Sequence, residues 1–296
     1  MIELRHLQAL AAVVEQQGFE KAAEQLAITQ SAISQRVRKL ETQVGHKLLV
    51  RSVPPVLTEK GELVLSHYQQ VAHLQDDLSL RLSEGDQAWR RVSIGTNGDS
   101  LAIWLLDALD PLLKTQNLLI DLKVDDQDRT HEMLRRGEVL GCISSSPEAI
   151  AGCNCVPLGR MVYHALVSPR YRQVYFPDGV TSEAVERAPC IEFNTKDELQ
   201  RRYLKQYFQC DYQVPKHRIP STESYLDCIV RGWGWGMAPD AQSLALREQG
   251  LIEEMVPGNT LETPLYWHIW NLGSQLHRDL THQLCTKAEA NLKPIT

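Results

Sequence analysis

At 296 residues, with 43% hydrophobic side chains, the chain is long enough for two domains of ordinary size with buried cores. It has no apolar run of about 18 residues and begins in a charged amphipathic segment, so we expect neither a transmembrane helix nor a signal peptide. Seven scattered cysteines are typical of reduced thiols. Together these features predict a cytoplasmic protein with no membrane partner.

The net charge of −6 is unevenly distributed along the chain. Residues 1–60 contain eight Lys or Arg and six Asp or Glu, a formal charge of +2, so residues 61–296 carry −8. Because the local potential governs contact with nucleic acid, the acidic total does not exclude DNA binding. It indicates instead that the larger, C-terminal part does not touch DNA.

Two short helices are predicted near the N-terminus. The segment from Phe19 to Leu26 has apolar residues at i, i+3, i+4 and i+7, the spacing of one helix face. After a tight turn, Thr29 is a favoured N-cap for a second helix. In that helix Ile33, Val37 and Leu40 face inward.

The outward face of the second helix carries amide, hydroxyl and guanidinium groups, which can read base edges in a major groove or hold phosphates. Such a pair is a helix-turn-helix with the second helix as reader. The same pattern also fits any amphipathic helix pair with a solvated outer face, so the flanking sequence has to decide. The DNA contacts that we predict are Thr29, Gln30, Ser31, Ser34, Gln35, Arg36, Arg38 and Arg51.

The flanking segments favour DNA binding. Leu7, Leu10 and Val14 supply a preceding helix on which the pair can pack. The segment Gly45–Gly61 has the pattern of a short β-wing followed by the start of another helix. This layout is that of a winged helix-turn-helix.

Over roughly residues 1–60 the chain resembles the LysR-type transcriptional regulators. The motifs that carry the resemblance are Ala22-Ala23, Gln30-Ser31-Ala32-Ile33-Ser34 and Leu57-Thr58-Glu59-Lys60-Gly61. Leu49-Val50-Arg51 departs from the Leu-Phe-x-Arg of many members. With Val53-Pro54-Pro55, this wing is similar to that of the subgroup that responds to arginine and lysine, the ArgP/LysG type.

A long helix is predicted from the cap at Thr58 to about Ser83. Its apolar residues form a narrow seam between polar ones: Val64, Tyr68, Val71, Leu74, Leu78 and Leu82. This seam could pack on the chain's own domains or form a two-stranded coiled coil with a second subunit. The family resemblance implies the coiled coil, and hence a homodimer on a roughly palindromic DNA site.

From Arg91 onward, strands and helices alternate, which predicts a parallel sheet covered by helices. The first set has strands at 92–96, 118–124 and 140–144 and helices at 99–114 and 130–136. The second has strands at 162–167, 190–193, 217–219 and 234–238 and helices at 196–208 and 222–231. A last strand at 266–270 and a helix at 275–292 are expected to return to the first lobe.

The predicted fold class is α/β, with an N-terminal winged helix-turn-helix (1–57), a linker helix and hinge (58–88) and an effector domain (89–296). The resemblance implies that this last domain is two-lobed and similar to periplasmic binding proteins. Lobe I would comprise 89–162 and 266–296, and lobe II 163–265, with crossings near 162 and 265. Such lobes close on a ligand about a hinge.

Ligands of open α/β sheets sit beyond the carboxyl ends of strands and at helix N-termini. Ser100 and nearby backbone N–H groups could hold a carboxylate, whereas Asp99 would suit an ammonium or guanidinium. Asp99 and Glu223 also fit simple helix capping, so either can be structural. The effector contacts that we predict are Asn97, Asp99, Ser100, Asp126, Ser144, Asn194, Thr222 and Glu223.

A cleft with hydroxyls, N–H donors and acids suits a zwitterion with a cationic side chain, which points to lysine or arginine. The similarity to the arginine- and lysine-responsive regulators continues through Thr96–Leu101, Leu134–Val139 and Leu265–His268. It implies that L-lysine or L-arginine, bound between the lobes, adjusts transcription of amino-acid export or biosynthesis genes. Gly98 and Asn194 depart from the group's pattern and leave the choice between the two open.

The sequence does not favour an enzyme, a metal site or a cofactor. His131-Glu132 begins like a zinc-protease motif, but Arg135 replaces the second His. Close packing of a buried strand explains the glycines of Gly232–Gly236 better than a dinucleotide site does. The alternative from another class is a small-molecule binding protein whose N-terminal helices serve dimerisation only. It would lack salt-dependent DNA affinity.

The mechanism that we expect joins the two ends of the chain. The dimer pairs into a homotetramer through its α/β domains and holds two sites on double-stranded DNA. Closure of the lobes on the ligand changes the bend of the DNA, to the extent that the ligand binds the closed form better. RNA polymerase is a further expected partner.

Overall fold

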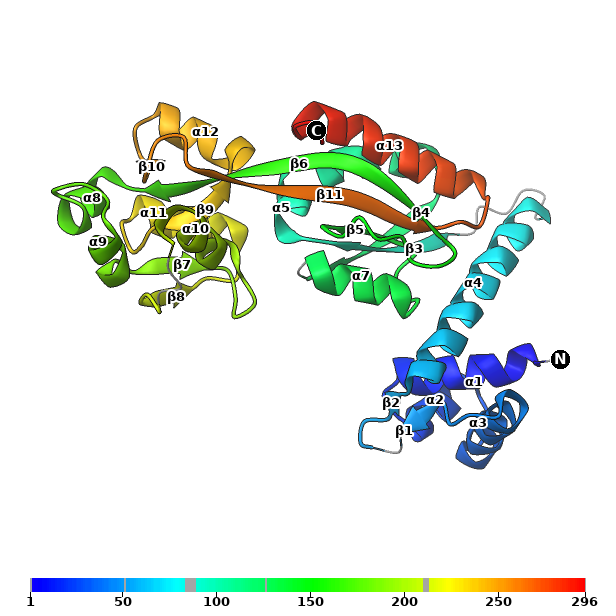
Figure 1. Ribbon diagram of the computed structural model, residues 1–296. Coiled ribbons are helices and arrows are strands. Elements are labelled where there is room, and N and C mark those ends of the chain that lie inside the picture. Colours follow the sequence, from blue (N-terminus) through cyan, green and yellow to red (C-terminus); the bar gives the residue numbers. More distant parts are fainter. Residues whose placement is uncertain (1, 51, 83–88, 126, 210–212, 296) are drawn as a thin grey trace.

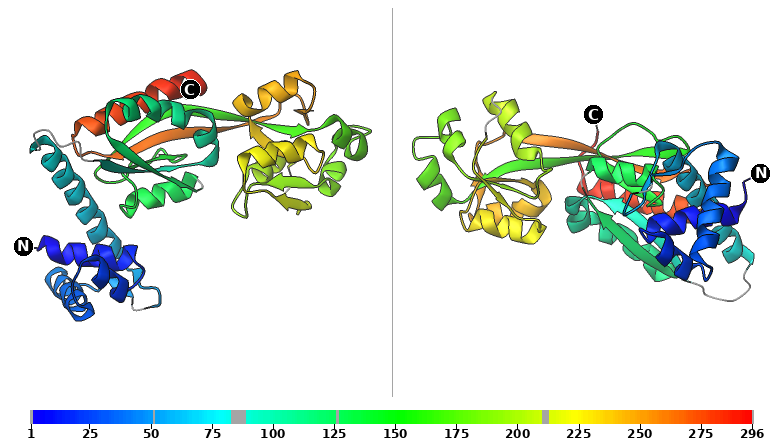
Figure 2. Two further views of the ribbon diagram at one scale, coloured as in Figure 1. Left: turned by 180° about the vertical axis from the view of Figure 1, so that it is seen from behind. Right: turned by 90° about the horizontal axis from the view of Figure 1, so that it is seen from below.

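The computed structural model describes residues 2–50, 52–82, 89–125, 127–209 and 213–295. A small helical domain at the N-terminus is connected by one long helix to an elongated α/β part with two lobes (Figures 1 and 2). None of the described helices is long and apolar enough to cross a membrane. The predicted fold class is confirmed.

The N-terminal domain is a winged helix-turn-helix. Its elements are α1 (Leu4–Glu15), α2 (Phe19–Gln25), α3 (Gln30–Val44), β1 (Leu49–Val50) and β2 (Val56–Leu57). Leu10, Ala22, Ile33 and Leu40 are fully buried in its core, as the apolar spacing predicts. Oγ1 of Thr29 accepts a hydrogen bond from the backbone N–H of Ala32 at 3.2 Å, so the predicted N-cap of the second helix is confirmed.

The long helix α4 (Glu59–Leu82) begins beside the wing, where Oγ1 of Thr58 accepts from the N–H of Gly61 at 3.0 Å. Only its first turns are buried against α1 in the part that the structure describes. Leu74 and Leu78 of the predicted seam remain 46% and 56% exposed. The hinge that we predict at residues 83–87 lies outside the described residues.

Lobe I contains a three-stranded parallel arrangement with β3 in the middle. Its 98–115 helix, predicted at 99–114, is continuous but takes a π-helical form over Leu101–Leu105. Trp104 and Leu105 of that segment are buried in the core. The elements are β3 (Arg90–Thr96), α5 (Gly98–Ser100), α6 (Leu106–Thr115), β4 (Leu118–Val124), α7 (Gln127–Arg135), β5 (Gly141–Ser144) and α13 (Gln275–Asn291).

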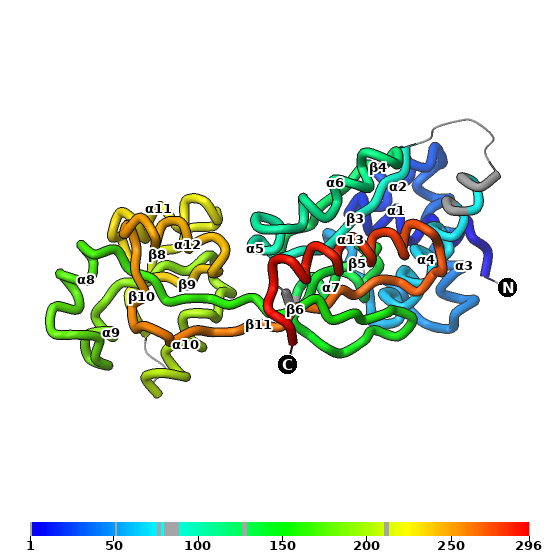
Figure 3. Tube along the Cα trace, turned by 90° about the horizontal axis from the view of Figure 1, so that it is seen from above, coloured from blue at the N-terminus to red at the C-terminus, as the bar shows by residue number. Residues whose placement is uncertain are grey.

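Two antiparallel strands, β6 (Cys153–Val167) and β11 (Thr260–Trp270), run from one lobe to the other (Figure 3). The sequence predicts only parts of them, 162–167 and 266–270. The error has a physical cause, because Pro157, Gly159 and Pro264 read as strand breakers, yet here they lie within the paired strands near a bulge at Leu265/Tyr266.

Lobe II is built from short strands and short helices. Its elements are α8 (Pro169–Tyr175), α9 (Ser182–Arg187), β7 (Cys190–Glu192), α10 (Leu199–Phe208), β8 (Lys216–Arg218), α11 (Thr222–Val230), β9 (Gly236–Pro239), α12 (Asp240–Glu248) and β10 (Glu253–Glu254). Strands β7 and β8 pair in parallel, and β9 and β10 pair with β6. The short helices α8, α9 and α12 are absent from the sequence prediction.

Candidate DNA-binding face and effector cavity

The outward face of α3 is open to solvent at the end of the molecule remote from the lobes (Figure 1). Thr29, Gln30, Ser31, Gln35 and Arg38 are exposed, and Ser34 is half-buried. A hollow between this helix, α2 and the wing is lined in part by Gln30, Ser34 and Arg38. These polar side chains are therefore presented together on one accessible face.

One predicted DNA contact that the structure describes does not join this face. Arg36 is half-buried, because it comes three residues after Ile33 and four before Leu40 and so lies toward the inward side of the helix. Arg51 lies outside the described residues.

The wing is attached to α3 through a buried acid. The carboxylate of Glu41 accepts from Lys47 Nζ at 2.7 Å and from the N–H of Leu48 at 3.1 Å. Burial acts to raise the pKa of Glu41, but these hydrogen bonds outweigh it and lower the pKa. The charged Glu41 thus fixes the start of the wing against the reading helix.

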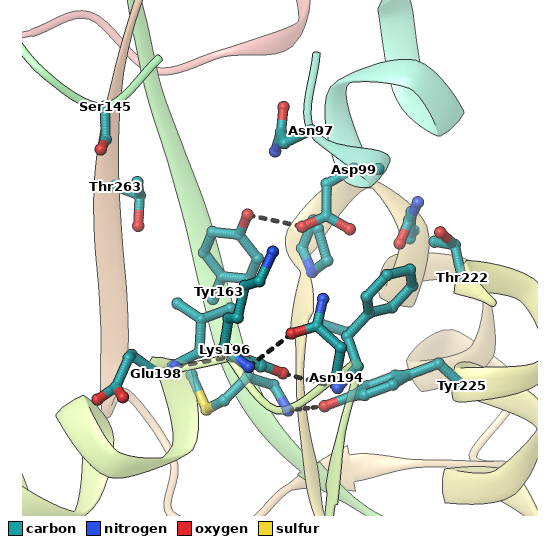
Figure 4. Close-up of a pocket in the computed structure, with 18 of the residues that line it drawn as sticks. Asn97, Asp99, Ser145, Tyr163, Asn194, Lys196, Glu198, Thr222, Tyr225 and Thr263 are labelled. Carbon is teal, nitrogen blue, oxygen red and sulfur yellow. Dashed lines mark hydrogen bonds between the residues drawn. The ribbon is translucent and has the colours of Figure 1, made fainter. Parts of the chain in front are cut away.

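A cavity of about 500 Å³ lies between the two lobes (Figure 4). Lobe I contributes residues that follow β3, β4 and β5, which is where open α/β sheets place their ligands. Lobe II contributes the segment after β7, the start of α11 and strand β9. The crossing strands β6 and β11 form the remaining wall.

Asp99 and Tyr163 connect the two sides of this cavity. The Tyr163 hydroxyl donates to Oδ2 of Asp99 at 2.7 Å. Burial raises the pKa of Asp99 to about 6, the hydrogen bond from Tyr163 opposes this rise, and the negative charge of Asp197 adds to it. A carboxylate held in this way would gain from a cationic ligand, which would replace the water that it has lost.

The segment between β7 and α10 is a tight polar turn. Asp197 accepts from the N–H groups of Phe193 and Leu199 at 2.8 and 3.1 Å, and Oδ1 of Asn194 accepts from the N–H of Lys196 at 2.7 Å. Burial raises the pKa of Asp197 against the lowering effect of these N–H donors. The ammonium of Lys196 reaches the opposite lobe, where it lies 3.0 Å from Oδ1 of Asp125.

The floor of the cavity is held by the buried hydroxyl of Tyr225. It donates to the carbonyl of Ile191 at 2.8 Å and accepts from the N–H of Met237 at 3.0 Å and from Gln200 at 2.9 Å. Burial raises the pKa of Tyr225 well above its usual range. Because this hydroxyl is fully used inside lobe II, we assign it a structural role.

The structure brings four predicted effector contacts to the cavity wall: Asn97, Asp99, Asn194 and Thr222. Asn97 is buried, and within the described part of the chain its Oδ1 has no hydrogen-bond partner. With less than 1 Å² of accessible surface, this oxygen is not open to a ligand in the cavity.

Three other predicted contacts lie elsewhere. Ser144 is buried at the end of β5 and accepts from the N–H of Ser146, so Ser145 lines the cavity in its place. Ser100 is buried behind the wall, and Glu223 is exposed on α11 away from the cavity. Asp126 lies outside the described residues.

Several lining residues escaped the sequence prediction. They are Tyr163, Lys196, Asp197, Glu198, Arg202 and Thr263. Four of them lie between Lys196 and Arg202. Their position shortly after the predicted strand 190–193 could have indicated that they line a ligand site. Four acids, Asp99, Asp125, Asp197 and Glu198, face this cavity with two bases, Lys196 and Arg202. The excess of acid favours a ligand with net positive charge.

Comparison with known proteins gives full-length matches. The family profile "Bacterial regulatory helix-turn-helix protein, lysR family" matches residues 4–62, and "LysR substrate binding domain" matches residues 85–283. The "HTH-type transcriptional regulator ArgP" of Pseudomonas fluorescens is 42% identical over 297 residues, covering 100% of each chain.

Solved structures agree with these matches. ArgP from Mycobacterium tuberculosis superposes with a TM-score of 0.89 at 32% identity, over 98% of each chain. Full-length LysG from Corynebacterium glutamicum, with bound effector Arg, has a TM-score of 0.83 at 30% identity, over 99% of this chain and 100% of that one.

These relatives are regulators of transcription and not enzymes, and they confirm the resemblance to the ArgP/LysG subgroup. The match to the helix-turn-helix profile also sets aside the alternative that the N-terminal helices serve dimerisation only. The chain therefore belongs to the LysR family of bacterial regulatory helix-turn-helix proteins, which are DNA-binding regulators of transcription.

Proposed function

We propose that this regulator binds a basic amino acid, L-arginine or L-lysine, in the cavity between its lobes and thereby controls genes of amino-acid export or biosynthesis. The observation that carries the proposal is the acidic lining of a cavity of amino-acid size, where four carboxylates face only two bases among the described residues. The relative LysG, which has bound effector Arg, supports it.

The cavity offers a complementary group for each charge of such a ligand. A ligand ammonium would pair with the carboxylate of Asp99. The carboxylate would fit Arg202, whose guanidinium lies 3.4 Å from both Thr263 Oγ1 and the Glu262 carbonyl. The guanidinium of a ligand would find Asp125 on the opposite side.

The DNA side of the proposal rests on α3. Thr29, Gln30, Ser31, Ser34, Gln35 and Arg38 would contact the operator, with Arg51 supporting them from the wing. The exposed Leu74 and Leu78 of α4 would pair with the same helix of a second copy, giving a dimer on a palindromic site. We further propose that two dimers pair into a tetramer and that the regulator contacts RNA polymerase. Its proposed location is the cytoplasm.

Closure of the two lobes would couple ligand binding in the cavity to the DNA-binding domain. We treat residues 89–162 with 266–296 and residues 163–265 as the moving bodies, joined by β6 and β11. A ligand that touches both lobes binds the closed arrangement better, so it shifts the population toward that arrangement. The change in the angle between effector domains would then alter the bend of the DNA.

A thermal-shift panel of the twenty amino acids on the full-length chain tests this proposal. A ligand that binds only the folded state raises the melting temperature, by an amount that grows with its concentration relative to Kd. We expect a selective rise with arginine, lysine or both. An equal rise with neutral or acidic amino acids, or no rise with any of the twenty, would contradict a basic effector.

A further inference from the structure

The ion pair between Lys196 and Asp125 spans the proposed ligand cavity. Asp125 directly follows β4 in lobe I, and Lys196 belongs to the turn after β7 in lobe II. Their charged atoms are 3.0 Å apart, and both residues line the cavity. Figure 4 shows Lys196 among the residues that surround the cavity. The chain thus places a primary ammonium of its own where a basic amino acid would bring one.

The geometry of Lys196 allows its ammonium to leave without disturbing the wall. Its backbone N–H is fixed by Asn194 Oδ1 at 2.7 Å, so the turn does not depend on the side chain. The side chain itself is 47% exposed. A lysine ammonium is a compact charge on a flexible stem, which can move from one partner to water at small cost.

The other charged groups of the cavity are engaged differently. Asp197 is held by backbone N–H groups, and Glu198 pairs with Arg201 at 3.1 Å. Asp125 also lies 3.6 Å from Arg129, which comes four residues later in the chain and belongs to α7. This second cation stays beside Asp125 when Lys196 moves away, so the carboxylate keeps a partner. Asp125 is thus a cavity carboxylate that lies closer to the part-exposed ammonium of Lys196 than to the guanidinium of Arg129.

We propose that Lys196 is an internal competitor, which occupies Asp125 until the cationic side chain of the ligand takes its place. This inference rests on the proposed function and names the residue that sets the affinity of that site. Each binding event exchanges one ion pair with Asp125 for another. Lys196 therefore weakens binding of a basic amino acid and raises the ligand concentration at which the regulator responds.

Calorimetric titration of the full-length chain with L-arginine and L-lysine tests the competitor. Lys196→Met removes the ammonium and keeps the length of the side chain. We expect it to tighten binding by about twofold to fivefold, the range of a part-exposed ion pair. The matched control is Lys205→Met, which removes the same charge from an exposed position on α10 of the same lobe and should leave Kd unchanged.

A double-mutant cycle identifies the carboxylate. Asp125→Asn should weaken arginine binding, and Lys196→Met should give no gain in the Asp125→Asn background, because the two side chains then have no shared partner. A full gain in that background would place the competition at another acid and overturn the assignment. If Lys196→Met folds poorly, Lys196→Gln serves as a second variant, and its melting temperature shows whether it is folded.

The outcomes separate this inference from the proposed function. Arginine or lysine binding by the wild type, with equal or weaker binding by Lys196→Met and Lys196→Gln, would overturn the competitor alone. No binding by the wild type but measurable binding by Lys196→Met would support both. No binding of either amino acid by any of the proteins would overturn both.

Discussion

The two functional regions of this regulator are built in opposite ways. The DNA-binding face comes from one continuous helix, α3, whose polar side chains lie on the surface. The cavity collects residues from segments as far apart as Asn97 and Thr263, and its acids are bonded to neighbours within the fold. Exposed groups act one by one, whereas bonded groups are coupled. We therefore expect DNA affinity to respond to single residues additively and ligand affinity to respond as a network.

The largest effect should come from the DNA side. Arg38→Ala removes an exposed guanidinium from both reading helices of a dimer. A lost base or phosphate contact costs about 1–3 kcal/mol. Two copies would thus lower DNA affinity by about 2–6 kcal/mol and reduce its salt dependence. Fluorescence anisotropy with genomic promoter DNA over a salt series measures both quantities.

The control for this prediction is Arg170→Ala, an exposed arginine on α8 of lobe II with the same change of charge. It should leave DNA affinity within a factor of about two, the usual range for surface changes away from a site. Equal losses of DNA affinity for the two variants would mean that Arg38 acts only through the overall charge of the protein. The DNA-binding face would then not consist of individual contacts on α3.

On the cavity side, Asp99→Asn should have the next largest effect. It removes a charge that we assign to the ligand ammonium while keeping the shape of the side chain. Hydrogen bonds to charged groups contribute about 1.5–3 kcal/mol, so arginine affinity should fall roughly tenfold or more. Glu223→Gln, a neutralised acid on the exposed face of α11, should bind arginine like the wild type. If both variants bind normally, the ammonium site lies elsewhere.

The pH dependence of ligand binding follows from the same carboxyl. Because the pKa of Asp99 is raised to about 6, lowering the pH through 6 protonates it and removes the partner of the ligand cation. Arginine should therefore bind about tenfold more weakly at pH 5 than at pH 7, since one pH unit below the pKa leaves about a tenth of the groups ionised. Asp99→Asn should flatten this dependence. Tighter binding at pH 5 would reverse the sign and contradict the role of Asp99.

The smallest predicted effect concerns the contact between the lobes at Gly98. A Cβ at this position would lie 3.5 Å from Thr222 Oγ1 and 3.9 Å from Phe193 Cζ, which is ordinary contact. Gly98→Ala should therefore be tolerated, whereas the branched side chain of Gly98→Val would hold the lobes apart. Overpacking of this kind costs about 1 kcal/mol at the low end of its range, or roughly a fivefold loss of arginine affinity. Equal affinities for the two variants would show that the lobes need not approach here.

The difference between the regions also explains what the sequence could predict. Helical periodicity and the cap at Thr29 predict the reading face without any tertiary information. The exception is Arg36, which we predicted as a DNA contact but which lies toward the core side of the helix. The cavity depends on which segments the topology brings together. Tyr163 lies within the predicted strand 162–167, and only the antiparallel crossing of β6 and β11 carries its hydroxyl to Asp99.

The neighbouring residues Ser144 and Ser145 show why the sequence alone could not identify the cavity lining. Ser144 and Ser145 are adjacent and chemically identical, and successive side chains at the end of a strand point in opposite directions. The strand β5 buries the first, and the second lines the cavity. Composition after a strand indicated that a hydroxyl would be present, but the register of β5 between β3 and β11 decided which one.

The most direct test of the account is calorimetric titration of the wild-type chain with L-arginine and L-citrulline, which matches arginine in size but lacks its side-chain charge. We expect saturable binding of arginine with one site per protomer, and citrulline at least tenfold weaker, because a lost ion pair in a partly buried acidic cavity costs about 1.5 kcal/mol or more. Equal affinity for the two ligands would contradict the claim that the cavity recognises positive charge.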